Sequence, residues 1–118
     1  MELKDIQKEL EGARGRLSDA RAFLHIDEKT ADLAALDEQA AAPDFWNDAA
    51  AAQAVSKRAS SLRATIVDYE RACSLADDAA TACELAGDDG AFAEEAAQAA
   101  AELTALLDQL EIESWFAG

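Results

Sequence analysis

Apolar residues recur along most of the chain at alternating intervals of three and four positions, the spacing that lines one side of an α-helix. The longest such series predicts a helix over residues 49–86, with a hydrophobic seam that has the 3.5-residue period of a coiled coil. A helix of that length extends roughly 55 Å. The seam positions are Val55, Ala59, Leu62, Ile66, Tyr69, Cys73, Ala76, Ala80 and Cys83.

Two shorter helices are predicted before it. The first covers residues 2–23, where the apolar stripe is Leu3, Ile6, Leu10, Ala13, Leu17, Ala20 and Leu24. The second begins with Asp27 as its N-cap and ends at Ala42, because Pro43 lacks a backbone N–H and disfavours helical geometry in the residue before it. Asn47 or Asp48 then caps the helix over residues 49–86.

A fourth helix follows the sequence GDDG at residues 87–90, which predicts a turn with Gly87 as the C′ residue and an aspartate as the next N-cap. Its seam is Phe92, Ala96, Ala99, Leu103, Leu106 and Leu110. No stretch shows the alternation of a β-strand. The predicted fold is therefore all-α: a coiled-coil-like antiparallel bundle of four helices, in which the last two form a long hairpin and the first two pack along its open face.

Length and composition agree with one helical domain over residues 1–118. The chain is 51% hydrophobic, and roughly a quarter of it is alanine, which favours helices and allows them to approach closely. No apolar run approaches the roughly 20 residues needed to span a bilayer, and the N-terminus is charged rather than signal-like. We expect a soluble, cytoplasmic protein.

Acidic residues dominate the chain, and their distribution is uneven. The net charge is −15, and residues 72–118 contain 11 acidic side chains and no lysine or arginine. Contacts to nucleic acid phosphates need basic side chains, so this charge excludes direct wrapping of nucleic acid. It leaves two interpretations, a solvated acidic face or a surface for a basic protein partner.

Candidate chemical groups are few. Cys73 and Cys83 would lie about 15 Å apart on one helix, too far for a disulfide, and their seam positions favour buried thiols over a metal or redox role. The single His25 has no Cys or Ser partner at a recognisable spacing and is interpreted as a surface or capping residue. No calcium loop, phosphate loop or paired-cysteine motif is present. We expect no enzyme activity, no cofactor and no metal site.

The stretch APDFWND at residues 42–48 holds the only proline of the chain beside two aromatic residues. Our interpretation is that Pro43, Phe45 and Trp46 form a structural seal at the end of the bundle, with both rings packed inward. The alternative is that the aromatic pair is exposed and binds a partner.

Three motifs together carry a family resemblance: LHID at residues 24–27, APDFWND at 42–48 and LEIESWFAG at 110–118. With the long helix and the GDDGAF turn between them, they resemble the N-terminal domain of the bacterial class I peptide chain release factor 2 family. The resemblance covers the chain from end to end. DFWND is its most specific part, because the sister family that reads the other pair of stop codons is less aromatic there.

The resemblance implies a role in translation termination. The intact factor would read the UAA and UGA codons and trigger hydrolysis of peptidyl-tRNA. Family members do this with a Ser-Pro-Phe motif and a Gly-Gly-Gln motif in later domains, and neither motif occurs in this sequence. No catalytic or codon-reading residue is therefore carried over, and the implied role is that of a domain that contacts the ribosome near the GTPase-associated centre.

An acidic helical surface suits a basic ribosomal protein better than bare RNA. The candidate contact is the tip of the long hairpin, Gly87, Asp88, Asp89 and Gly90, together with the acidic faces beside it. The alternative is a self-standing acidic coiled-coil adaptor or dimerisation module, which the reading frame beyond Gly118 would distinguish. We expect a monomer, because four helices in one chain can cover each other's seams.

Overall fold

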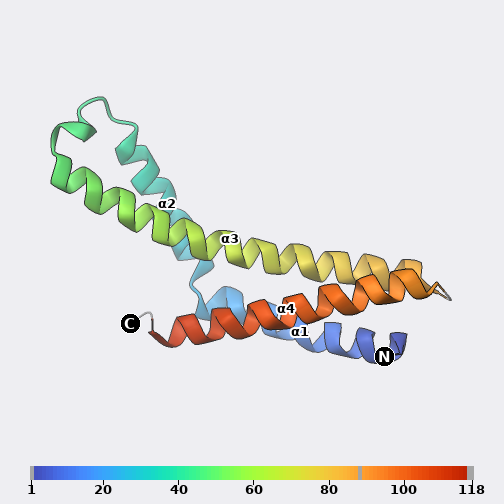
Figure 1. The fold of residues 1–118 in the computed structure, drawn as a ribbon. Helices are drawn as coiled ribbons and strands as arrows, with labels where there is room; N and C mark the ends of the chain where they lie inside the picture. The colour runs from blue at the N-terminus through green and yellow to red at the C-terminus, as the bar shows by residue number, and fades with distance from the viewer. Residues whose placement is uncertain (1, 88, 117–118) are drawn as a thin grey trace. The chain divides into compact units, whose positions relative to one another are not determined.

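The computed structural model describes residues 2–87 and 89–116, and within these ranges it contains helices and turns but no strand (Figure 1). This confirms the all-α prediction. The long third helix begins and ends where the sequence places it, with Asp48 Oδ1 accepting a hydrogen bond from the N–H of Ala51 at 3.1 Å as its N-cap. The elements are α1 (Leu3–Phe23), α2 (Ile26–Ala40), the 3₁₀-helix η1 (Phe45–Asn47), α3 (Ala49–Ala86) and α4 (Gly90–Phe116).

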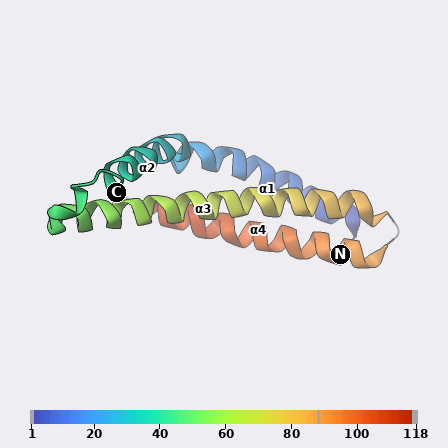
Figure 2. The ribbon, with the colours of Figure 1, turned by 90° about the horizontal axis from the view of Figure 1, so that it is seen from above.

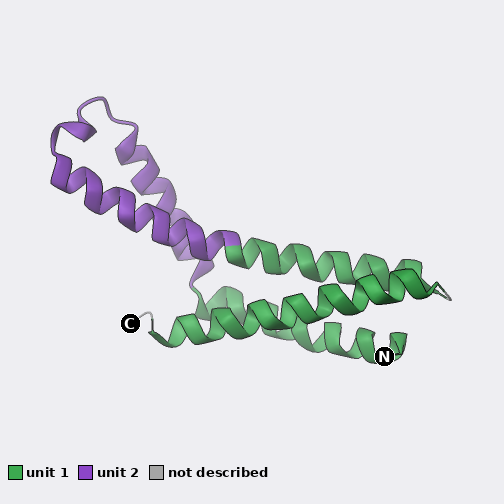
Figure 3. Cartoon of the chain, in the orientation of Figure 1, with its two compact units in different colours: residues 1–24, 68–118 green, residues 25–67 purple. Residues whose placement is uncertain are grey.

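The chain gathers into two compact units that share helix α3 (Figure 3). The first unit combines residues 1–24 with 68–118, and the second comprises residues 25–67. Helix α3 is therefore divided between the two units. The expectation that residues 1–118 fold as one domain stays a prediction.

In the first unit, α1 and the C-terminal part of α3 both pack against α4 (Figures 1 and 2). Side-chain contacts define the directions. Glu9 accepts a hydrogen bond from Thr104 and Arg16 pairs with Asp108, so α1 and α4 run parallel. The C-terminal part of α3 runs antiparallel to α4 and forms the expected long hairpin with it (Figure 1).

Alanine supplies about half of the buried apolar residues in the described part of the chain. The buried surfaces of α3 and α4 are wider than a single seam, because in the first unit each of these helices has two neighbours. On α4, Ala100 and Leu107 are fully buried although the predicted seam omits them, whereas Phe92 and Ala99 are only half-buried. The alanines among the buried residues let the helices approach closely.

The second unit is a hairpin of α2 and residues 49–67 of α3. Leu36 and Ala40 line the same surface groove as Val55 and Ala59, and Arg63 pairs with Asp37 at 3.0 Å. The structure thus groups α2 with the N-terminal part of α3, not with the α3–α4 hairpin as predicted. The short α2–α3 connection makes these two helices neighbours.

The ends of α2 also differ from the prediction. Its N-cap is His25 rather than Asp27: His25 adopts the left-handed conformation (φ 56°, ψ 45°), which is uncommon for a residue other than glycine. The helix ends at Ala40, before the predicted Ala42. The N–H groups of Ala41 and Ala42 still bond to carbonyls of the last turn, since Pro43 restricts Ala42 without abolishing the turn.

Candidate functional site

The tip of the α3–α4 hairpin is the contact surface that the sequence predicts, and local backbone chemistry builds it. Gly87 has a φ of +42°, which favours glycine and confirms its place as the C′ residue of α3. Asp89 is exposed, and its Oδ1 accepts a hydrogen bond from the N–H of Ala91 at 2.9 Å, so it caps α4. Gly90 is the first residue of α4. Asp88 lies outside the described residues.

Six carboxylates along α3 and α4 in the first unit fall into two groups. Those that face α1 are paired with its arginines: Arg14 lies 3.8 Å from Asp77, and Arg16 lies 2.6 Å from Asp108 and 3.1 Å from Glu111. Arg16 donates hydrogen bonds to Glu111 and to Asp108, and these two bonds, the first contributing more, raise the pKa of Arg16 above its ordinary value. On this side of the first unit, two arginines of α1 therefore pair with three carboxylates.

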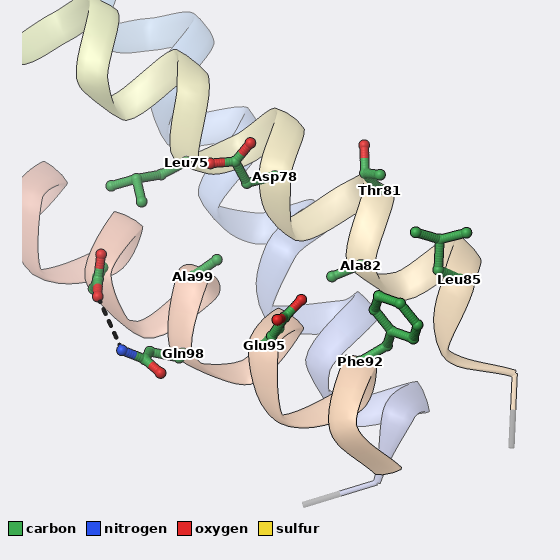
Figure 4. A pocket seen from close by; sticks show the side chains of 10 residues that line it. Leu75, Asp78, Thr81, Ala82, Leu85, Phe92, Glu95, Gln98 and Ala99 are labelled. Atoms are coloured by element: carbon green, nitrogen blue, oxygen red, sulfur yellow. Dashed lines mark hydrogen bonds between the residues drawn. The ribbon is translucent and has the colours of Figure 1, made fainter. Parts of the chain in front are cut away.

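The second group lines a groove between α3 and α4, which we call the α3–α4 groove. It has a volume of about 450 Å³, and its carboxylates are Asp78, Glu95 and Glu102 (Figure 4). Within the described part of the chain, Asp78 and Glu95 form no ion pair, and Glu102 accepts one hydrogen bond, from Gln98 at 3.4 Å. The apolar lining consists of Leu75, Ala82, Leu85, Phe92 and Ala99.

In the turn at residues 42–48, which we call the aromatic turn, only one of the two aromatic rings packs inward, whereas the sequence predicted that both do. Phe45 is half-buried beside α2, and its ring meets that of Trp46 edge to face at 4.8 Å. Trp46, however, is 62% exposed, and Pro43 is exposed as well. Predicted burial of Trp46 is therefore wrong: in the 3₁₀-helix η1 the two adjacent side chains point in different directions, and only Phe45 turns toward the helices.

The surroundings of Cys73, Cys83 and His25 indicate structural roles for these residues. Cys73 and Cys83 are both free, the first half-buried and the second buried. Burial raises the pKa of Cys83, which makes the thiolate scarce. Burial, followed by a hydrogen bond with Cys73, raises the pKa of Tyr69. His25 is exposed at the start of α2, where Nδ1 lies 2.7 Å from Glu28 Oε2.

Over residues 2–87 and 89–116, no three His, Cys, Asp or Glu side chains come together in a way that could hold a metal ion. The same ranges contain no helix that is long and apolar enough to cross a membrane.

One exposed apolar surface was missed by the sequence prediction. Ile112, Trp115 and Phe116 on the last turns of α4 are 49%, 75% and 82% exposed. Their spacing of three and four positions puts them on one side of the helix. The signal was present, because all three follow the last seam position, Leu110, which is fully buried.

Comparison with known proteins places these surfaces in a family context. The family model described as the PCRF domain matches residues 29–117. Over its whole length the chain is 33% identical to peptide chain release factor 2 of Streptomyces avermitilis, covering 33% of that protein. It is 35% identical to peptide chain release factor 2 of Beutenbergia cavernae and 32% identical to that of an Exiguobacterium species, covering 97% and 96% of this chain and 31% of each relative. The chain thus spans about a third of the length of these curated relatives.

Proposed function

We propose that this chain, which belongs to the PCRF domain family, acts in translation termination in the cytoplasm as the ribosome-contacting domain of a peptide chain release factor 2. The observation that carries the proposal is the match over 96–100% of the chain to relatives that bear this name. In the intact factor, recognition of UAA and UGA and hydrolysis of peptidyl-tRNA would belong to other parts of the polypeptide. This domain would position them.

The physical features of the chain support positioning over chemistry. Hydrolysis of an ester needs a group held close to the scissile bond, and codon reading needs contacts to bases. This chain lacks the Ser-Pro-Phe and Gly-Gly-Gln motifs, and its net charge of −15 disfavours contact with RNA. Its exposed carboxylates suit a basic ribosomal protein near the GTPase-associated centre.

A release reaction run beside a ribosome-pelleting measurement tests the proposal. The chain alone should release no peptide from ribosomes programmed with UGA, at any concentration, but it should pellet with them. Excess chain should also slow release by an intact release factor 2. Binding should weaken as salt rises, because exposed charges are screened beyond about 8 Å at physiological ionic strength.

Because Asp89 caps α4, variants at the hairpin tip must separate the loss of its charge from the loss of its cap. Asp89→Asn retains an oxygen that can cap α4 and removes the charge, whereas Asp89→Lys reverses the charge and removes the cap. If the charge at the tip contacts the ribosome, both variants should bind more weakly than the parent, and Asp89→Lys should bind the least. Codon-dependent release by the chain, or failure to bind ribosomes at low salt, would refute the proposed function.

A further inference from the structure

We propose that the α3–α4 groove is the docking site for a basic amphipathic helix of a protein partner. Two sets of side chains form its sides, and they share one spacing. Leu75, Asp78, Ala82 and Leu85 lie on α3, and Phe92, Glu95, Ala99 and Glu102 lie on α4 (Figure 4). Both sets follow intervals of three, four and three positions, so each forms one stripe along its helix.

The apolar part of the groove matches a helical ligand. In Figure 4 the small side chains of Ala82 and Ala99 lie between the larger Leu75, Leu85 and Phe92. Leu85 is 56% exposed, so much of its side chain is available to a ligand. Residues 75–85 of α3 extend about 15 Å, which accommodates about three turns of a docked helix. Helix-in-groove recognition uses such apolar anchors one turn apart.

The negative charge of the groove indicates that its ligand is positively charged. None of the described residues that line the groove is a lysine or arginine, and Asp78 and Glu95 form no ion pair in the described part of the chain. At one end, Glu102 also lines an adjoining groove with Arg71. On the α1 side, by contrast, Arg14 and Arg16 form ion pairs with three carboxylates of the same two helices. Lysines or arginines flanking the apolar anchors of a partner helix would supply the missing cations.

The same charge argues against other occupants. A second copy of the chain would bring another groove of the same sign and a further net charge of −15. Nucleic acid would bring phosphates to unpaired carboxylates. A basic helix gains from both the apolar floor and the acidic sides. The groove inference rests on the proposed function in one respect: that function implies that the partner helix belongs to a basic ribosomal protein.

The test uses a dye-labelled helical peptide of about 14 residues, with leucines at positions i, i+3, i+4 and i+7 and lysines at the polar positions. A shuffled peptide of the same composition has no apolar face, and a glutamate version has the opposite charge. Fluorescence anisotropy should give a Kd below about 100 μM for the lysine peptide and at least about tenfold weaker binding for the other two. Equal binding of the shuffled peptide, or no binding of the lysine peptide, overturns the proposal.

Matched variants locate the site. Asp78→Lys combined with Glu95→Lys reverses two charges in the groove, and Glu84→Lys combined with Glu94→Lys makes the same change at exposed positions outside it. The groove variant should weaken peptide binding at least about tenfold and the control less than about threefold, because close charges act far more strongly than distant ones. Leu85→Ser should also weaken binding with no change in charge. Equal losses in the two double variants would overturn the groove assignment.

Ribosome pelleting separates this inference from the proposed function. If the parent chain binds the peptide in the groove but does not bind ribosomes, the proposed function fails and the groove inference is supported. If the chain binds ribosomes but not the peptide, the proposed function stands and the groove inference fails. Circular dichroism of each variant shows that lost binding does not reflect lost helix.

Discussion

At the scale of single residues, the aromatic turn shows how neighbours in sequence take different roles. Phe45 is half-buried beside α2, whereas Trp46 is 62% exposed and touches Phe45 edge to face. Burial of apolar area stabilises a fold in proportion to the area removed from water. The two rings should therefore contribute unequally to stability, and the exposed indole remains accessible to a partner.

Separate alanine substitutions test this difference. Phe45→Ala should lower the free energy of unfolding by about 1–2 kcal/mol, since part of its ring is removed from water in the fold. Trp46→Ala should lower it by no more than about 0.5 kcal/mol, the range typical of surface substitutions. Thermal or urea unfolding measures both. A larger loss for Trp46→Ala would restore the sealing interpretation that its exposure argues against.

At the scale of elements, α1 is the helix whose own sequence supports it least. It contains Gly12 and Gly15, both exposed, and a Cβ added at either position would meet no atom within 4 Å. Glycine in a helix costs about 1 kcal/mol relative to alanine. The helix is therefore held largely by packing of its apolar stripe and by the ion pairs of Arg16 with α4.

Replacing these glycines should stabilise the protein. Gly12→Ala and Gly15→Ala should each raise the free energy of unfolding by about 0.5–1 kcal/mol, because alanine loses less conformational entropy on forming a helix. Gly87→Ala is the matched control: it also has open space around its Cβ, but its φ of +42° strains any other residue, so it should cost about 1 kcal/mol. Urea unfolding checks all three. Stabilisation by Gly87→Ala would contradict the role assigned to its left-handed backbone.

At the scale of the whole molecule, charge and exposed apolar surface oppose each other. The net charge of −15 makes copies of the chain repel one another. Ile112, Trp115 and Phe116 nevertheless leave a large apolar surface exposed at the end of α4. The balance between these two effects decides the oligomeric state in solution.

We expect a monomer at moderate ionic strength. Sedimentation at about 100 μM detects association of about −5 kcal/mol or stronger, and it should show a single species with the mass of one chain. High salt screens the repulsion, so any dimer should appear there first. Trp115→Ser with Phe116→Ser should then abolish it. A dominant dimer at low salt that survives these substitutions would contradict the expectation and show an interface elsewhere.

Sequence alone determined the helices and the turn between the last two, because these depend on nearby residues. The extent of α3, its cap at Asp48 and the left-handed Gly87 follow from rules that act within a few positions. The family motifs likewise need no structure. The prediction of Asp27 as the N-cap of α2 was wrong, because the cap is His25, whose left-handed backbone no local rule demanded. The interpretation of His25 as a surface or capping residue is confirmed.

Tertiary structure alone decided which neighbour covers each apolar stripe. Periodicity shows that one side of a helix is apolar, but it does not say whether one helix or two will pack there, and alanine suits buried and exposed positions alike. For that reason the wider burial at Ala100 and Leu107 and the exposure of Trp46 were not predictable. The α3–α4 groove was not predictable either, because only the structure shows which carboxylates pair with arginines of α1 and which line the groove.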